Sequence, residues 1–581
     1  MSENPFARRN KKEIAELVHV ASGRNPADLC LDNARIVNVY SGEVIEGSVA
    51  VYGDRIAGVG PDYDARERVD LEGAYIAPGF IDAHFHLESS MVTVPEFTRA
   101  VLPLGTTSAV ADPHEIANVF GYNGIRFMLE SSKYNPMNVF FTMPSCVPAT
   151  SMETSGAEME AFDLYPFLRE KWVVGLGEVM NYPGVLKGDP DTLDKIAIYS
   201  EKRLEGHAPG LSGKQLAGYI STGISSDHEA TTIEEAREKL RLGMYVMIRE
   251  GSAAKNLIDL LPLVTCENKS RFMLVTDDHN PVDIIRHGHM DGVVRKAIKN
   301  GLEPITAIQL ATLNPAEYFG LRDLGAIAPG KLADLIVFNN FEDIKIHAVY
   351  KNGSLVARKG KPVYVDPPRP RPALRSSVNI KWLEGGEFEY PAGKGKCRVM
   401  KIIPEQIVTD TLLVEPKIED GKIVSDVDND ILKVCVIERH TASGRIGKGL
   451  VQGFGIKTGA VASTVAHDSH NIIVVGVSDE DIARAVVRLN KIGGGISVIK
   501  NGKPLEELEL PIAGLMSERP LLVVAEKIER ITKAIKELGS SLDDPLMTLS
   551  FLALPVIPKL KLTDRGLVNV DTFDYVNLFE A

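Results

Sequence analysis

The stretch GFIDAHFH, residues 79–86, decides the fold more than any other part of the chain. Its apolar residues predict a buried strand, and two histidines, His84 and His86, stand two positions apart at its end. Side chains at positions i and i+2 of a strand share one face. The two imidazoles are therefore expected to converge at the end of this strand, where together they could bind a metal ion.

Seven more apolar stretches with polar ends follow, and helical patterns such as TIEEAREKLRLG (232–243) separate them. They lie at residues 106–114, 138–145, 172–179, 204–209, 223–230, 244–251 and 271–278. This alternation over residues 77–325 predicts an α/β fold, a (β/α)8 barrel of the TIM type. Functional residues of such barrels lie at the carboxyl ends of the strands, so the polar strand ends are candidate site residues.

The segments before and after the predicted barrel have different sequence patterns. Residues 1–24 read as a helical lead, and residues 25–76 and 326–365 read as short strands with turns that together form a small β-sandwich domain. The stretch DPPRPRPALR, residues 366–375, is rich in proline and predicts an extended linker. Residues 376–581 mix strands and helices, which indicates a separate C-terminal α+β domain.

Composition restricts the partners. The 581 residues carry a formal net charge of −13, which argues against nucleic acid and against an anionic membrane, since both require clustered Lys and Arg. The five cysteines form no CxxC pair, the N-terminal residues contain no apolar core of a secretory signal, and no stretch of about 18 apolar residues occurs. We expect a cytoplasmic enzyme that acts on a small molecule, assembled as a homo-oligomer of two or more chains.

Four further residues with metal-binding side chains end later strands: Glu178, His207, His228 and Asp277. With His84 and His86 they make a set suited to two metal ions, in which a carboxylate bridges and imidazoles complete each coordination shell. Two ions lower the pKa of a shared water, and a strand-end Asp can take a proton from that water and return it to a leaving amine.

Longer strings carry a resemblance to a known family: PGFIDAHFHLESSM (78–91), ADPHEIANV (111–119), GLGEVMNYPGV (175–185), LVTDDHNP (274–281) and VASTVAHDSHNIIVVG (461–476). They resemble the adenine deaminase family of the amidohydrolase superfamily, over nearly the whole chain. In many amidohydrolases a carboxylated lysine on the fourth strand bridges the metals. Here Glu178 stands at that place, which departs from the lysine type and matches adenine deaminase.

The resemblance implies hydrolytic deamination of adenine to hypoxanthine and ammonia by a metal-activated hydroxide. It implies two divalent ions per subunit, Mn²⁺ or Fe²⁺, although Zn²⁺ also suits these ligands. The implied roles, position by position, are the more buried metal for His84 and His86, the second metal for His207 and His228, the bridge for Glu178, and metal ligation with proton transfer for Asp277. Asp277 is chosen over Asp278 because neighbouring side chains of a strand face opposite sides.

Other polar residues near the strand ends are candidate contacts of the purine: Glu88, Ser89, Ser90, His114, Glu115 and His279. For His114 and Glu115, binding of an extra metal ion is an alternative. Glu88, Glu115 and His279 are alternatives for the group that protonates the purine ring, while loop and helix capping, with Asp112 as the cap before the helix, accounts equally for several of them. His467, Asp468 and His470 form a second polar cluster, which lies either at the active-site entrance or in a hydrogen-bonded turn or a contact between domains.

Two other functions remain open from the sequence. The same metal site would serve a hydrolase that opens a cyclic amide, and a barrel of this kind can also act as a binding scaffold without catalysis. The zinc deaminases that carry H-x-E and P-C-x-x-C motifs are excluded, because this chain has no such cysteine pair.

Overall fold

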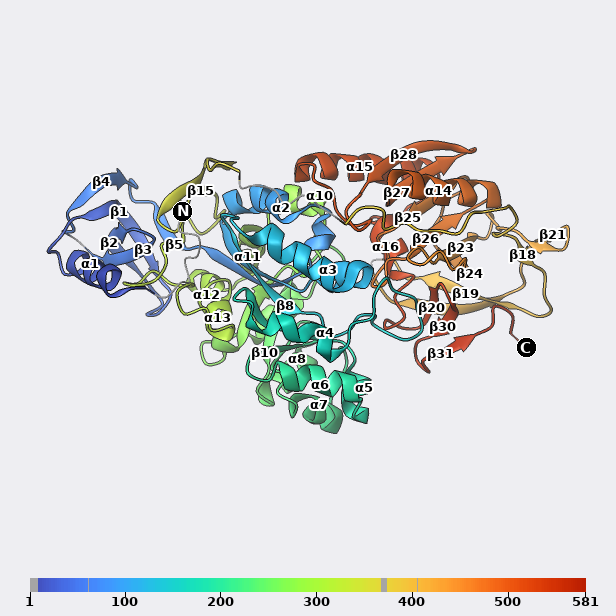
Figure 1. The fold of residues 1–581 in the computed structure, drawn as a ribbon, viewed down its shortest axis with the longest axis horizontal. Coiled ribbons are helices and arrows are strands. Elements are labelled where there is room, and N and C mark those ends of the chain that lie inside the picture. Colours follow the sequence, from blue (N-terminus) through green and yellow to red (C-terminus); the bar gives the residue numbers. More distant parts are fainter. Residues whose placement is uncertain (1–8, 61, 367–373, 405, 581) are drawn as a thin grey trace.

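The computed structural model of the chain describes residues 9–60, 62–366, 374–404 and 406–580 (Figure 1). Residues 1–8 of the predicted helical lead, and most of the predicted linker, lie outside the described residues. Within the lead, helix α1 (Lys11–Ala21) begins at Asn10, whose side chain accepts the backbone N–H groups of Lys12 and Glu13. That contact satisfies two of the free N–H groups of the first turn.

Two distant segments build one nine-stranded sheet at the blue end of the molecule (Figure 1). Its strands are β1 (Ala27–Asn38), β2 (Glu43–Tyr52), β3 (Arg55–Val59), β4 (Ala65–Asp70), β5 (Tyr75–Pro78), β14 (Leu335–Phe338), β15 (Ile346–Lys351), β16 (Ser354–Arg358) and β17 (Lys361–Pro362). Strand β5 pairs antiparallel with β14, and this pairing joins the segments that precede and follow the barrel. The β domain therefore has its own core, which draws on both segments.

The predicted barrel is confirmed: eight strands pair in sequence order and every pair is parallel. The strands are β6 (Phe80–Phe85), β7 (Thr106–Ala111), β8 (Asn138–Met143), β9 (Val173–Val179), β10 (Arg203–Gly206), β11 (Ser226–Asp227), β12 (Tyr245–Arg249) and β13 (Phe272–Val275). The first and last strands meet through a parallel bridge between Phe85 and Asp277, just beyond the end of β13. This closure places both chain positions at the same mouth of the barrel.

The C-terminal segment folds around a second large sheet of eight strands (Figure 1). They are β19 (Cys397–Ile402), β20 (Thr409–Val414), β23 (Ile431–Ile437), β24 (Ile446–Gln452), β25 (Ala460–Ser463), β26 (Ile472–Gly476), β27 (Gly495–Lys500) and β28 (Lys503–Glu509), accompanied by helices α14 (Asp479–Ile492), α15 (Leu521–Glu537) and α16 (Pro545–Phe551). Strands β23, β25 and β26 are buried along their whole length, which explains their nearly unbroken apolar sequences. The turn between β25 and β26, residues 464–471, is buried as well.

Two further observations concern the whole of the described chain. None of its helices has the length and apolar character needed to cross a bilayer. All five cysteines are unpaired thiols, four of them buried and Cys266 exposed.

Candidate metal centre

Closure of the barrel brings His84, His86 and Asp277 together. The backbone N–H of Asp277 donates to the carbonyl oxygen of His84 at 3.0 Å, and the N–H of His86 faces the carbonyl of Asp277 at 3.4 Å. His84 lies near the end of strand β6 and His86 directly follows it, at the point where the chain beyond β13 pairs with this strand. The backbone hydrogen bonds that close the barrel thus place His86 beside Asp277, although the two residues are almost two hundred positions apart in the sequence.

Glu178, at the end of β9, stands between two pairs of imidazoles. Its Oε2 lies 2.6 Å from Nδ1 of His207 and 3.1 Å from Nε2 of His228. Its Oε1 lies 3.4 Å from Nε2 of His86. Burial alone would raise the pKa of Glu178, but the charges and hydrogen bonds of His207 and His228 hold that pKa well below its usual range. The carboxylate is therefore ionised and faces both pairs.

His84 occupies the deepest position of the group. Its Nε2 lies 3.8 Å from Oδ1 of Asp277 and has no hydrogen-bond partner among the described residues. Its ring stacks on that of His228 with 4.2 Å between the centroids. Burial lowers the pKa of His84 to about 3, so the imidazole is neutral and Nε2 or Nδ1 keeps a free lone pair.

The donor set fits divalent metal ions. Three groups have all their candidate ligand atoms within 4.8 Å of one another: His84 with His86 and Glu178; His84 with His228 and Asp277; and Glu178 with His207 and His228. The structure thus brings all six predicted ligands together in one cluster, in which five residues are buried and His207 is partly buried, and Glu178 belongs to two of the groups. A buried imidazole nitrogen without a partner is costly unless something binds it, and a metal ion is the partner that four imidazoles and two carboxylates favour.

The Nδ1 atoms of His84 and His86 also have defined neighbours. Nδ1 of His86 faces the backbone carbonyl of Asp112 at 3.3 Å, and Nδ1 of His84 faces Oε2 of Glu205 at 3.5 Å. Such contacts fix the orientation of an imidazole and leave its other nitrogen for a metal ion. Asp112 does not cap the helix that follows it: its Oδ2 accepts the backbone N–H of Glu178 at 3.0 Å.

Arg249 and Glu229, which the sequence analysis did not single out, form a network of ion pairs with Asp277. Nη1 of Arg249 lies 2.7 Å from Oδ2 of Asp277, and Nη2 lies 3.0 Å from Oε2 of Glu229. Burial would raise the pKa of Asp277, but the charge of Arg249 and the hydrogen bond of His86 hold it well below its usual range. Both missed residues end predicted strands, in MIREG (247–251) and DHEA (227–230), so their position was a usable signal.

The expectation that only one of Asp277 and Asp278 faces the barrel mouth is wrong. Asp278 lies with His86 and Asp277 in a further group whose ligand-type atoms are within 4.8 Å. Strand β13 ends at Val275, and Asp277 has a left-handed backbone with φ of 57°. The alternation of a strand therefore no longer applies, and both carboxylates turn to the same side.

Two of the predicted purine contacts, Ser89 and His114, lie beside the candidate ligands at this mouth. Oγ of Ser89 donates to Oδ1 of Asp278 at 2.5 Å. The ring of His114 lies edge-on to that of His86, 4.7 Å between centroids, and its Nδ1 is 3.7 Å from Oε1 of Glu178. Ser90 is different, because its Oγ donates to the backbone carbonyl of Leu87 and serves the local turn.

Two other candidates have different surroundings. Oε1 of Glu88 accepts the backbone N–H of Ile116 at 3.0 Å, in the first turn of helix α3 (His114–Ser132). His279 stacks on His289, 5.8 Å between centroids, and burial lowers its pKa to about 4. The structure places His279 against that second histidine and not beside the six candidate ligands.

The polar cluster of the C-terminal segment reaches the barrel. Nδ1 of His467 lies 2.7 Å from Oε1 of Glu115, and Nε2 of His470 lies 3.0 Å from Oε2 of the same carboxylate. Oδ1 of Asp468 is 3.9 Å from Nε2 of His114. The turn 464–471 therefore contacts the barrel next to the candidate metal centre.

Comparison with known proteins covers almost the whole chain. The model of the amidohydrolase family matches residues 75–356, and that of the adenine deaminase C-terminal domain matches residues 406–574. Adenine deaminase 2 of Carboxydothermus hydrogenoformans is 50% identical over 97% of this chain and 99% of its own length. The adenine deaminases of Desulfatibacillum aliphaticivorans and Brucella anthropi are 49% and 45% identical, again over 97% of this chain and at least 99% of their own lengths.

Proposed function

This chain belongs to the adenine deaminase family of the amidohydrolases, and from that membership we propose that it hydrolyses adenine to hypoxanthine and ammonia. The reaction replaces an exocyclic amine on carbon by oxygen, so the enzyme is a hydrolase of C–N bonds in a cyclic amidine. The full-length similarity to proteins named adenine deaminase supports this proposal, and so does the match to the C-terminal domain.

The observation that carries the chemistry is the position of Glu178. Its two oxygens face different histidines, His86 on one side and His207 with His228 on the other. A carboxylate in this position can join two metal sites, which is why we propose two ions per subunit. When bound, such ions lower the pKa of a shared water and stabilise negative charge that develops on the substrate.

The residues of the chain supply the proton transfers. Asp277 accepts a proton from the attacking water through its carboxylate, while Arg249 keeps that carboxylate ionised and fixes its orientation at 2.7 Å. The same proton then passes from Asp277 to the amine, which leaves as ammonia. Ser89 and His114 lie at the mouth, where they can position the base.

A substrate screen tests the proposal. The purified chain is supplied with Mn²⁺ or Fe²⁺, and ammonia release is followed with adenine, other purine bases, nucleosides and cyclic amides. We expect release from adenine, with a matching change in the ultraviolet spectrum from adenine to hypoxanthine. Ring opening of a cyclic amide without attack on adenine would contradict the proposal, and so would a protein that binds metal but turns over none of these compounds.

Three finer points are also proposals. Membership of the family supports Mn²⁺ or Fe²⁺, although imidazole and carboxylate ligands suit Zn²⁺ as well, and reconstitution of the metal-free protein with each of these ions would compare them. Five unpaired thiols are typical of a reducing compartment, which supports a cytoplasmic location that microscopy of a tagged chain can check. Self-association into dimers or larger oligomers stays a prediction, which light scattering would measure.

A further inference from the structure

We propose that His467, a residue of the C-terminal segment, donates a proton to a ring nitrogen of the bound purine while water adds at C6. This inference rests on the proposed function and adds a catalytic residue to it. It also gives the C-terminal segment a direct part in the reaction, because His467 lies in the turn between β25 and β26 and not in the barrel.

Two contacts of its ring and one of its backbone hold His467 in place. Its Nδ1 lies 2.7 Å from Oε1 of Glu115, and its face stacks on Phe551 with 4.9 Å between centroids and 18° between the planes. The backbone N–H of His467 donates to Oγ of Ser550 at 3.2 Å. The ring is thus oriented before substrate arrives, and its Nε2 has no hydrogen-bond partner among the described residues.

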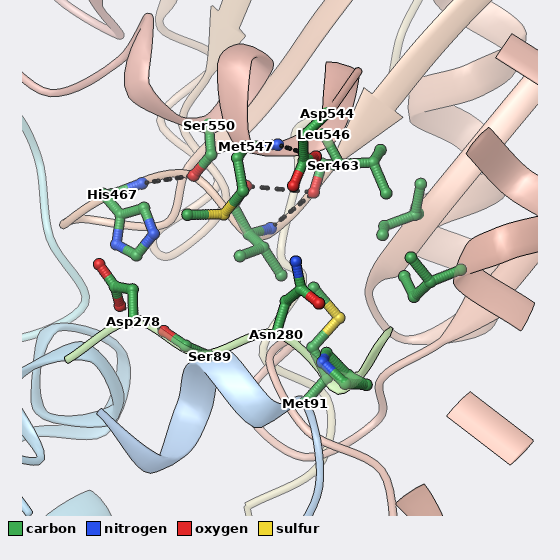
Figure 2. A pocket seen from close by; sticks show the side chains of 14 residues that line it. Ser89, Met91, Asp278, Asn280, Ser463, His467, Asp544, Leu546, Met547 and Ser550 are labelled. Atoms are coloured by element: carbon green, nitrogen blue, oxygen red, sulfur yellow. Dashed lines mark hydrogen bonds between the residues drawn. The ribbon is translucent and has the colours of Figure 1, made fainter. Parts of the chain in front are cut away.

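The free side of His467 lines a cavity between the barrel and the C-terminal segment (Figure 2). The barrel contributes Ser89 and Asp278, and helix α16 contributes Met547 and Ser550. In the figure the His467 ring lies next to Asp278. Because Asp278 also neighbours the ligand-type atoms of His86 and Asp277, the cavity adjoins the candidate metal centre. A purine whose C6 lies at that centre would extend toward His467.

The charges around His467 keep a proton on its ring. Burial alone would lower the pKa of His467, but the charge and hydrogen bond of Glu115 outweigh it and raise the pKa to about 9. Burial would raise the pKa of Glu115, yet His467 and His470 hold it well below its usual range. The pair is therefore an ionised carboxylate beside an imidazolium, and the Nε2–H of that imidazolium is available to a ligand in the cavity.

A metal ion could also be imagined among Glu115, His467 and His470, since their ligand-type atoms lie within 4.8 Å. The hydrogen bonding of His470 argues for a different arrangement. Its Nδ1 accepts the backbone N–H of Ala466 at 3.1 Å, so in the neutral ring the hydrogen is on Nε2, which lies 3.0 Å from Oε2 of Glu115. His470 then has no lone pair left for an ion, and its role is to hold the carboxylate that orients His467.

The three groups that the sequence offered for this step, Glu88, Glu115 and His279, are less suited to it. Glu88 does not line this cavity, and its Oε1 accepts the N–H of Ile116, while both oxygens of Glu115 face histidines of the turn 464–471. His279 stacks on His289, and its pKa of about 4 leaves it without a proton to give at neutral pH. His467 combines a held proton, a fixed ring and a free nitrogen on the cavity.

The protons of the reaction balance with this assignment. As the oxygen of water bonds to C6, the electron pair displaced from the ring C–N double bond takes up the Nε2 proton of His467, and one water proton goes to Asp277. The C6–N bond to the amine then breaks, and the amine leaves as ammonia with the proton from Asp277. As the carbonyl forms at C6, the second proton of the water leaves the C6 hydroxyl and binds Nε2 of His467, which restores the imidazolium. Adenine and water thus give hypoxanthine and ammonia.

The test compares His467→Gln with His470→Gln, which alters a second partner of Glu115 but no nitrogen facing the cavity. Turnover is measured with 2-fluoroadenine, adenine and 2,6-diaminopurine, whose ring nitrogens increase in basicity in that order. We expect His467→Gln to lose roughly 10²–10⁴-fold in kcat, and its rate to depend more steeply on ring basicity than the wild-type rate does. His470→Gln should lose less and keep the wild-type dependence. Glu115→Gln, which removes the charge that holds the proton, should resemble His467→Gln.

Several results would overturn the inference. One is wild-type kcat in folded His467→Gln; another is a loss of rate with unchanged dependence on ring basicity, which indicates a structural role only. Loss of a metal equivalent from His467→Gln, measured by elemental analysis, would make this residue a ligand. Wild-type protein that releases no ammonia from adenine would overturn the proposed function itself, which separates the two failures. If His467→Gln does not fold, the same comparison with Glu115→Gln decides.

Discussion

The guanidinium of Arg249 lies between two buried carboxylates, 2.7 Å from Oδ2 of Asp277 and 3.0 Å from Oε2 of Glu229. A single cation thus joins the end of β12 to the residue proposed to move protons. The variant Arg249→Met would leave both carboxylates without that cation. We expect unfolding free energy to fall by roughly 3–5 kcal/mol, because an uncompensated buried charge is costly. Arg249→Lys should lose less, and urea midpoints of the three proteins, all metal-loaded, would rank them; a Met variant as stable as wild type contradicts this account.

Asp277 is the residue whose side chain should matter most for turnover. Asp277→Asn keeps the size and one oxygen of the side chain but removes its ability to accept a proton. We expect kcat for adenine to fall by about 10²–10⁴-fold. Asp259→Asn, at an exposed position of helix α9 (Leu257–Leu260), is the matched control. Near wild-type turnover of Asp277→Asn, with metal content verified, would show that another group moves the proton.

Glu205 should act through His84. Its Oε2 faces Nδ1 of His84 at 3.5 Å, and it is 1% exposed. Glu205→Leu removes the carboxyl group that faces Nδ1 of the imidazole, so we expect metal affinity to fall roughly 10–100-fold. Glu205→Gln keeps an oxygen at this position and should lose less. Competition with a chromogenic chelator measures both, and equal affinity of wild type and Glu205→Leu would show that the contact does not orient His84.

Removal of the metal should also lower stability. Six ligand-type side chains lie together in one cluster, and ions that bind only the folded chain stabilise it by mass action, by about 4 kcal/mol each at 1,000 times Kd. We expect a chelated sample to unfold at lower temperature and lose activity. Mn²⁺ or Fe²⁺ should restore both, whereas Ca²⁺, which prefers oxygen ligands, should not. A melting temperature that does not change on chelation, in a sample shown to be free of metal, would contradict the proposed ligand set.

Glu153 should make stability depend on pH. It is buried where the barrel meets the C-terminal segment, and burial, with the charge of Asp468, raises its pKa from 4.5 to about 8. Because the pKa of Glu153 is higher in the folded than in the unfolded protein, the folded protein binds this proton more tightly. The contribution of the bound proton to stability is complete below pH 4.5 and is lost as pH rises toward about 8. Glu153→Gln does not titrate, so its advantage over wild type should grow across this range to roughly 2–4 kcal/mol, since one pKa unit corresponds to about 1.4 kcal/mol.

Denaturant unfolding at pH 5 and pH 8.5 measures that difference. Glu158→Gln, at an exposed position of the same loop, provides the control. A stability difference between Glu153→Gln and wild type that is equal at both pH values would show that Glu153 does not titrate in this range.

Local sequence patterns predicted both the barrel and the six candidate ligands, because the positions of the ligands follow from the barrel. Parallel strands end at one mouth, so a polar residue after an apolar stretch has a predictable location, as His84, Glu178 and His228 show. The same reasoning was wrong for Asp278, because the left-handed backbone of Asp277 ends the alternation and no local pattern announces it. Arg249 and Glu229 were missed although they also end strands, since their side chains pair with each other and form no recognisable ligand motif.

The contact between Glu115 and His467 could not be predicted. The two residues belong to different parts of the chain, and each lies in a stretch that could equally cap a helix or form a turn. Their meeting depends on how the C-terminal segment sits against the barrel, which is fixed by contacts such as those of Asp564 with the N–H and hydroxyl of Thr154, at 2.9 and 2.6 Å. Contacts of this kind leave no periodicity in the sequence.

The pairing of β5 with β14 has a consequence for how the protein is made. While a ribosome synthesises the chain, β5 is complete long before Leu335 emerges to pair with Pro78. At about 5–20 residues per second, the roughly 250 residues between them take on the order of 10–50 s. During that interval the edge of β5 is open to other strands, which invites misassociation. The β domain is therefore the first part to be translated but can be finished only after the last barrel strand has left the ribosome.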